Sequence, residues 1–184
     1  MIETVYIEQY RQRIFLIHRL LGIPESYAKD NCLPLQIEAD NLTEAGLDIF
    51  ERPQRLILQA LNGWLDMQTA AGQDGIKLFM VSAFRSVDYQ CQLIERKLER
   101  GQSLDKILSV NAAPGYSEHH TGRALDIATV DSEPLTEDFA NTSAFLWLKE
   151  NAADFAFTLS YPENNPYGLT YEPWHWAFRD VDTP

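Results

Sequence analysis

Two short segments of the chain carry the side chains that could perform hydrolytic chemistry. The first runs from Ser117 to Asp126 and contains His119, and the second contains Glu172 and His175. A hydrolytic zinc site uses three protein ligands, keeps a fourth position open for water, and has a nearby carboxylate that takes the proton of the water. The two segments together supply such a set, with His119, Asp126 and His175 as the ligands and Glu172 as the base.

The residues around Asp126 indicate how the first segment positions its ligands. A strand over residues 123–129 would place Asp126 on one face between two alanines, with the large aliphatic residues on the opposite face, toward the core. Gly122 lets the backbone turn sharply between His119 and this strand, so that both side chains can reach one ion. We therefore expect Asp126 to lie on the floor of a site.

The second segment needs a turn. In a regular strand Glu172 and His175 would point to opposite faces, so a turn at Pro173 is required if both are to reach the same ion. Each segment also has an ordinary interpretation, as a surface histidine or as packed tryptophans. The interpretation as a zinc site depends on finding both segments in one chain. His18, in a helical segment, is interpreted as structural.

These residues resemble the motifs of the VanY-like D,D- and L,D-carboxypeptidases of bacterial cell-wall metabolism, which are zinc peptidases. The family pattern is S-x-H-x-x-G-x-A-x-D followed by E-x-W-H, and residues 117–126 and 172–175 match both parts completely. Residues 82–90 resemble a third family segment, S-G-Y-R-S followed by Gln. The resemblance extends from about residue 77 to about residue 178 in the family's motif order.

The resemblance implies a role for each matching residue. His119, Asp126 and His175 would bind Zn2+, Glu172 would be the catalytic base, and Arg85 would hold the terminal carboxylate of the substrate. Ser117 and Gln90 would hydrogen-bond the peptide near the scissile bond, and Tyr161 matches a family tyrosine position near the substrate. Ser160 and Ala177 occupy positions where family members often carry arginine, and this departure affects substrate recognition more than the metal site.

A physical argument that is independent of the resemblance also supports a role for Arg85 in binding a carboxylate. A planar guanidinium binds a carboxylate through two parallel hydrogen bonds, and Arg85 is predicted to lie in a loop between a strand and a helix. The alternative is a surface arginine without a specific role. An aspartate ligand makes the metal a weaker Lewis acid than three histidines would, so a nearby cation would help to stabilise the oxyanion. The sequence leaves open whether Arg85 or His120 provides it.

Composition limits the classes of partner. The formal net charge is −12, with 27 acidic and 15 basic residues, so neither nucleic acid nor an anionic membrane surface is expected to attract the chain. A small peptide held by a local arginine is compatible with this charge. Whether Cys32 and Cys91 pair is left open, because two cysteines form no disulfide framework. No targeting segment is visible, which predicts a cytoplasmic protein; a periplasmic or secreted protein whose signal had been removed would look the same.

The hydrophobic patterns predict the elements that position these residues. Helices are expected over residues 3–21, 53–71, 87–100, 104–110 and 143–154, and strands over residues 77–84, 123–129, 157–160 and 174–178. Residues 23–50 are interpreted as irregular, and residues 164–168 as either a wall of the groove or a surface loop. Helices early and short strands late predict an α+β fold in which a small central antiparallel sheet is flanked by helices.

The chain is interpreted as one zinc carboxypeptidase domain over residues 1–184, with a helical part at about 1–75 and a motif-bearing part at about 76–180. The family resemblance implies zinc in an open groove and removal of a C-terminal D-alanine from a peptidoglycan stem peptide or muropeptide. L,D-cleavage of tetrapeptides is favoured, because a cytoplasmic enzyme fits muropeptide recycling. The alternatives are D,D-cleavage of pentapeptides ending in D-Ala-D-Ala and a non-enzymatic peptidoglycan-binding module, against which Glu172 argues. The oligomeric state is not predicted.

Overall fold

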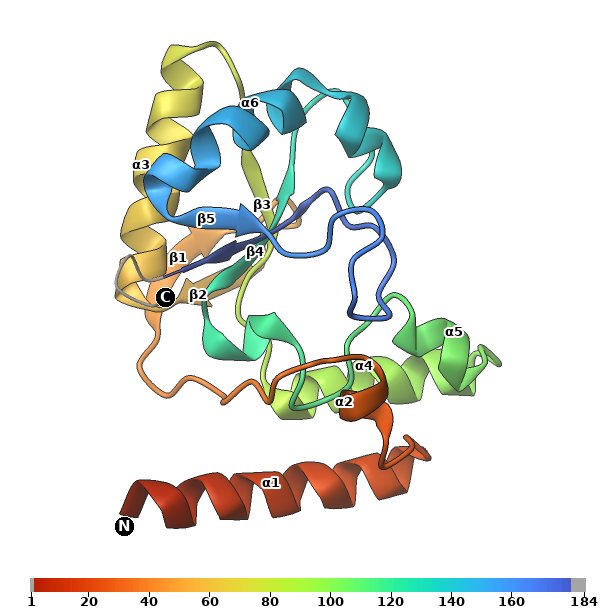
Figure 1. Cartoon of the computed structure of the whole chain (residues 1–184). Coiled ribbons are helices and arrows are strands. Elements are labelled where there is room, and N and C mark those ends of the chain that lie inside the picture. The colour runs from red at the N-terminus through yellow and green to blue at the C-terminus, as the bar shows by residue number, and fades with distance from the viewer. Residues whose placement is uncertain (1, 180–184) are drawn as a thin grey trace.

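A four-stranded antiparallel sheet in the order β3-β4-β6-β5 lies at the centre of the structure (Figure 1). The computed structural model describes residues 2–179. The strands of the sheet are β3 (Phe79–Ser82), β4 (Ala124–Ala128), β5 (Phe157–Leu159) and β6 (His175–Phe178). Every residue of the central strand β4 is buried. The prediction of an α+β fold with a small antiparallel sheet is confirmed.

The helices lie on both sides of this sheet. They are α1 (Ile2–Leu21), α2 (Tyr27–Asp30), α3 (Leu58–Gln73), α4 (Val87–Glu99), α5 (Leu104–Leu108) and α6 (Ser143–Asn151). Three short 3-10 helices accompany them: η1 (Glu118–Thr121), η2 (Glu137–Asn141) and η3 (Ala152–Phe155). No α-helix of the described chain is both long and apolar enough to cross a membrane.

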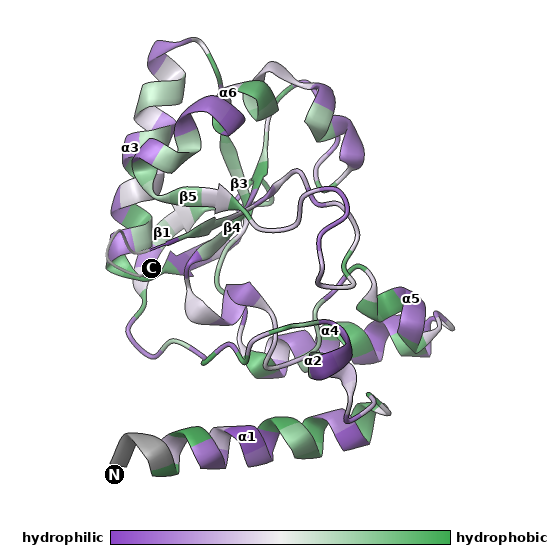
Figure 2. Cartoon of the chain, viewed as in Figure 1, coloured by the Kyte–Doolittle hydropathy of each residue, from purple (hydrophilic) through white to green (hydrophobic). Residues whose placement is uncertain are grey.

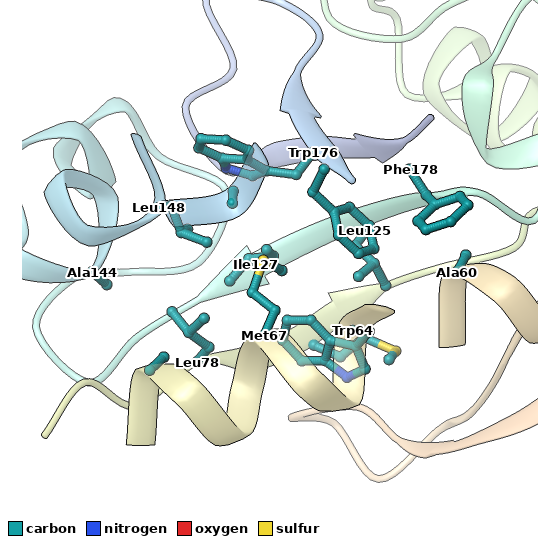
Figure 3. Close-up of a cluster of buried hydrophobic side chains, with 14 of the residues drawn as sticks. Ala60, Trp64, Met67, Leu78, Leu125, Ile127, Ala144, Leu148, Trp176 and Phe178 are labelled. Atoms are coloured by element: carbon teal, nitrogen blue, oxygen red, sulfur yellow. The ribbon is translucent and has the colours of Figure 1, made fainter. Parts of the chain in front are cut away.

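One face of the sheet packs against α3 and α6. Trp64 and Met67 of α3 approach Leu125 and Ile127 of β4, and Leu148 of α6 belongs to the same buried cluster (Figure 3). Because successive side chains of a strand point to opposite faces, this packing directs the residue between the two aliphatic side chains to the other face of the sheet. The predicted alternation of this strand is confirmed.

The other side of the molecule is formed by α1, α2, α4 and α5, which lie below the sheet in Figure 1. Tyr10 and Ile14 of α1 are buried against Val87, the first residue of α4. The chain approaches α1 closely at Gly115, where an added Cβ would lie 2.7 Å from Ile14 Cγ1. Hydrophilic and hydrophobic residues alternate along α1 (Figure 2), which agrees with a helix that buries one face only.

The sequence-based assignment was wrong between residues 43 and 57. The structure has a hairpin there, made of β1 (Thr43–Leu47) and β2 (Pro53–Leu56), in place of an irregular segment followed by a helix from residue 53. The helix α3 begins only at Leu58. Proline is compatible with the first turn of a helix and also with an edge strand, so Pro53 alone did not distinguish the two. The short helix α2 was also missed.

The remaining elements agree with their predicted positions to within a few residues at each end. The helix predicted over residues 143–154 is divided between α6 and η3. Cys32 and Cys91 are free thiols, which answers the question of their pairing. The loop of residues 164–168 lines neither of the two cavities described below: an added Cβ at Gly168 would collide with Asn31, so this loop packs near the end of α2.

Candidate active site

The register of the sheet brings Asp126 and His175 together. The two residues are directly opposite each other in the antiparallel pair of β4 and β6. Side chains at opposed positions project from the same face of a sheet, and His175 Nδ1 lies 3.1 Å from Asp126 Oδ1. This face is the one opposite α3 and α6, so the two side chains meet on the side of the sheet that does not carry the main core.

His119 reaches the same point from η1. Its Nδ1 is hydrogen-bonded to the backbone oxygen of Ala83 at 2.6 Å, and its ring lies 4.9 Å from the ring of His175 between centroids. Gly122 ends η1 in the left-handed conformation, at φ 66°, and an added Cβ would lie 2.7 Å from the side chain of Leu42. The glycine is therefore required both for the turn into β4 and for the close approach of the chain.

The donor atoms of these three residues suit a zinc ion. One donor from each of His119, Asp126 and His175 lies within 4.8 Å of the others, and all three residues are buried. His119 Nε2 is a buried nitrogen without a hydrogen-bond partner among the described residues, and it lies 3.3 Å from Asp126 Oδ2. Two imidazole nitrogens and one carboxylate oxygen are a donor set that zinc accepts.

Glu118 orients the second histidine, a role that was not foreseen. Its Oε2 lies 3.0 Å from His175 Nε2, so Glu118 can accept a hydrogen bond from that nitrogen while Nδ1 faces Asp126. Arg179 in turn donates to Glu118 at 2.6 Å and to Ser160 at 3.3 Å. Metal-binding histidines commonly donate their second N–H to a carboxylate or carbonyl in this way. The only signal in the sequence was the acidic residue beside His119.

The electrostatics of the site favour a positive charge between the carboxylates. Burial lowers the pKa of His175, but its hydrogen bonds to Asp126 and Glu118 raise it to about 10. Burial raises the pKa of Glu118, but the hydrogen bond with His175 lowers it to about 2. The pKa of Asp126 is well below its usual range, because the neighbouring histidines and Arg85 outweigh its burial. The carboxylates of Asp126 and Glu118 thus favour a cation at the position between them.

Glu172 lies beside this group of donors in a different electrostatic environment. Burial raises the pKa of its carboxyl group to about 7. Its Oε2 lies 3.9 Å from His175 Nδ1, and the backbone N–H of His175 donates to the Glu172 carbonyl at 3.0 Å. That hydrogen bond closes the turn at Pro173 that the sequence required, and it brings both side chains to the same face. A carboxyl group whose pKa is near neutrality can both accept and return a proton.

Arg85 and His120 have different surroundings. The Arg85 side chain lines the cavities at the site, and its Nη2 donates to Asp126 Oδ2 at 3.0 Å. His120 is fully buried, with Nδ1 2.6 Å from the backbone oxygen of Arg85 and Nε2 accepting from the N–H of Gly115 at 3.1 Å. Both ring nitrogens of His120 are therefore engaged with the backbone, and Arg85 is the one of the two whose charge faces the site.

Two cavities meet at the site. The smaller, of about 30 Å³, is lined by the three other predicted substrate-contact residues, among others: Ser117, Gln90 and Tyr161. The ring of Tyr161 lies 4.7 Å from that of His175, and Gln90 Nε2 donates to the backbone of Ala112 while its Oε1 is buried without a partner. The larger is a groove of about 430 Å³. Arg85, Asn111 and Glu172 line both, so they mark the boundary between the two spaces.

Comparison with known proteins shows which family the chain is similar to. The model of the family described as VanY, D-alanyl-D-alanine carboxypeptidase, matches residues 54–181. The chain is 34% identical over 121 residues to a putative carboxypeptidase, YodJ, of Bacillus subtilis, covering 64% of this chain and 44% of that protein. It is 28% identical over 178 residues to a D-alanyl-D-alanine carboxypeptidase of Enterococcus faecium, covering 94% and 53%. The chain thus spans about half the length of these curated relatives.

Solved structures show the same fold. The LD-carboxypeptidase LdcB is similar at a TM-score of 0.69 and 30% identity, covering 79% of this chain and 71% of that one. VanYB in complex with D-alanine-D-alanine is similar at a TM-score of 0.62 and 24% identity, covering 81% and 82%. A VanY D,D-pentapeptidase in complex with Zn(II) is similar at a TM-score of 0.59 and 23% identity, covering 80% and 88%.

Proposed function

The chain belongs to the VanY family of D-alanyl-D-alanine carboxypeptidases, and on that premise we propose that it is a zinc-dependent enzyme that removes a C-terminal D-alanine from peptidoglycan-derived peptides. One observation carries the proposal. Three buried zinc-type donors converge on one point, and the carboxyl group of Glu172, whose pKa burial raises to about 7, lies beside them. A protein that only binds peptides would have no use for that carboxyl group.

The metal, Glu172 and Arg85 would each perform a different part of the reaction. Zinc, when bound, supplies a Lewis acid that polarises the scissile carbonyl and makes water a nucleophile near neutral pH. Glu172 accepts the proton of the attacking water on its carboxylate and returns it to the leaving amine. Arg85 places a fixed positive charge next to Asp126, where it can stabilise the developing oxyanion or hold the terminal carboxylate.

The two cavities fit an exopeptidase. The smaller cavity lies against His119 and His175, at the closed end of the space beside the donor atoms. We place the terminal D-alanine there, within reach of Ser117, Gln90 and Tyr161, and the rest of the peptide in the larger groove. The scissile bond would then lie at the boundary between the cavities, beside Arg85 and Glu172.

We favour L,D-cleavage of a tetrapeptide over D,D-cleavage of a pentapeptide. The likeness to the LD-carboxypeptidase LdcB, at 30% identity and a TM-score of 0.69, supports this preference. The description of the matching family and the name of the Enterococcus faecium relative support D,D-cleavage, which is the second candidate.

Mass spectrometry of synthetic stem peptides tests both the carboxypeptidase activity and the preference for L,D-cleavage. The zinc-loaded protein is incubated with a tetrapeptide, with a pentapeptide ending in D-Ala-D-Ala, and with each peptide amidated at its C-terminus. We expect loss of a single D-alanine from the free tetrapeptide and no cleavage of either amide, because an amide lacks the charge that a guanidinium binds. Faster cleavage of the pentapeptide would favour the D,D-enzyme. Equal cleavage of free and amidated peptides would contradict a carboxypeptidase.

A further inference from the structure

Lys97 is a half-buried cation in the wall of the groove. It lies on α4 and lines the groove together with Arg52 and Arg85. Those two arginines are already paired, Arg52 with Asp48 and Arg85 with Asp126. The ammonium group of Lys97 makes no ion pair or hydrogen bond to any described residue.

An unpaired ammonium group in this position indicates an anionic ligand. Partial burial without a partner costs free energy, which surface lysines avoid by remaining in water. Burial lowers the pKa of Lys97, the charge of Arg85 lowers it further, and Glu172 raises it. The chain has 27 acidic residues, yet none of the described ones forms a salt bridge with this lysine.

The position of Lys97 relative to the two cavities indicates which part of the substrate it would meet. Lys97 lines the larger groove but not the small cavity that we assign to the terminal residue. The charges that affect it most are those of Arg85 and Glu172, which lie at the boundary between the cavities. Lys97, Arg85 and Glu172 thus line one groove, in which the residues before the scissile bond would lie if the terminal residue occupies the small cavity.

We propose that Lys97 binds a carboxylate on the side chain of the penultimate residue of the substrate. The enzyme would then prefer stem peptides whose diamino acid carries a free side-chain carboxylate, as diaminopimelate does, over peptides with lysine at that position. Both diamino acids carry a side-chain ammonium group, but only diaminopimelate also carries a carboxylate that can pair with Lys97. Lysine would bring an ammonium group alone, and like charges repel. This inference rests on the proposed function and specifies its substrate class.

The test uses three tetrapeptides that differ only at the penultimate residue: diaminopimelate, diaminopimelate with its side-chain carboxylate amidated, and lysine. The proteins are the wild type, Lys97→Met and the control Lys106→Met. Lys106 is an exposed lysine on α5, so its substitution changes the net charge by the same amount as Lys97→Met but outside the groove. We expect Lys97→Met to lower kcat/KM for the free-carboxylate peptide by about tenfold or more, mainly through KM. We expect no loss on the amidated peptide and wild-type behaviour of Lys106→Met.

Two results would overturn the inference. One is an equal loss, or no loss, on the free and amidated peptides in Lys97→Met. The other is a loss in Lys97→Met on the lysine peptide as large as the loss on the free diaminopimelate peptide, which would move the contact to a different residue of the peptide. Absence of D-alanine release by the wild-type protein would instead contradict the proposed function. Calorimetric binding of the uncleaved peptides to zinc-loaded Glu172→Gln, with and without Lys97→Met, tests the contact independently of turnover.

Discussion

At the scale of single residues, the site separates side chains that would hold a metal from one that would move a proton. His119, Asp126 and His175 each aim a donor at a common point, whereas Glu172 lies beside that point with a pKa of about 7. The difference is physical: Asp126 is surrounded by cationic or hydrogen-bonding groups, and the pKa of Glu172 is determined mainly by its burial. Substitutions can therefore separate metal binding from turnover.

Substitution of Glu172 should abolish turnover and leave the metal in place. We expect Glu172→Gln to retain one zinc per chain and to lose at least roughly a hundredfold in kcat, as is typical for removal of a general base. His119→Ala should lose the metal together with activity. Elemental analysis and release of D-alanine measure the two effects separately. Loss of zinc from Glu172→Gln would make Glu172 a ligand and contradict the division of roles.

Substitution of Glu118 should weaken the metal without removing any ligand. The Glu118 carboxylate accepts from His175 Nε2 and thereby holds the ring so that Nδ1 faces Asp126. Loss of such a supporting group typically costs about 10- to 100-fold in metal affinity or activity. We expect that loss in Glu118→Gln, measured by competition with a zinc chelator. The matched control is Glu163→Gln, at an exposed glutamate outside the site, which should bind zinc as the wild type does.

The sequence allowed the convergence of His119, Asp126 and His175 to be predicted, but not the groups that hydrogen-bond to them. The spacing around Asp126 predicts its face of the strand, and the motif places His119 and His175 near it. The partner of His175 could not be predicted, because Glu118 and His175 are far apart in the chain and meet only when η1 lies beside β6. Lys97 is a similar case. Its place on a helix was predictable, but the sequence could not show that it lines the groove, because the groove forms only when the elements pack together.

At the scale of elements, the β1–β2 hairpin is organised around one buried carboxylate. Asp48 accepts hydrogen bonds from the backbone N–H groups of Phe50 and Arg52 and from the side chains of Arg52 and Gln54. Phe50 and Arg52 also line the groove. The hairpin was missed because β1 (Thr43–Leu47) contains a glycine and alternates poorly, and because Pro53 is also compatible with the start of a helix.

Asp48→Asn should destabilise the hairpin in a manner that depends on pH. Burial raises the pKa of Asp48, but the hydrogen bonds from Arg52 and Phe50 outweigh burial and bring the pKa below its ordinary value of 3.8. A depressed pKa in the folded state means that the ionised carboxylate stabilises the fold above pH 3.8, and that this contribution is lost as the pH falls through the folded-state pKa.

We therefore expect Asp48→Asn to lower the free energy of unfolding by about 1–3 kcal/mol at pH 7, and the difference from the wild type to shrink below pH 3.8. Urea unfolding of the zinc-free protein, followed at several pH values, measures this difference. Asp66→Asn, at an exposed position of α3, is the matched control and should change stability little at any pH. A difference that does not vary with pH would show that the charge of Asp48 contributes nothing.

At the scale of the whole molecule, the proposed zinc site joins parts of the chain that are distant in sequence. His119 comes from η1, Asp126 from β4 and His175 from β6, and hydrogen bonds to Ala83 and Glu118 extend the connection to the end of β3 and back to η1. The buried core between the sheet and α3 and α6 is separate from this group of residues. We therefore expect the core to hold the fold without metal, and zinc, when bound, to add stability to the opposite face of the sheet.

Zinc should raise the melting temperature by an amount that follows from its affinity. A ligand at one hundred times its Kd stabilises the native state by about 2.7 kcal/mol, which corresponds to about 5–10 °C for a chain of this size. We expect this shift for the wild type and for Glu172→Gln, and not for His175→Ala, in scanning calorimetry with and without excess zinc. Magnesium at the same concentration should have no comparable effect, because it prefers oxygen ligands in octahedral geometry. An equal zinc-induced shift in His175→Ala would mean that zinc stabilises the protein at a different site, and the ligand set would then have to be reassigned.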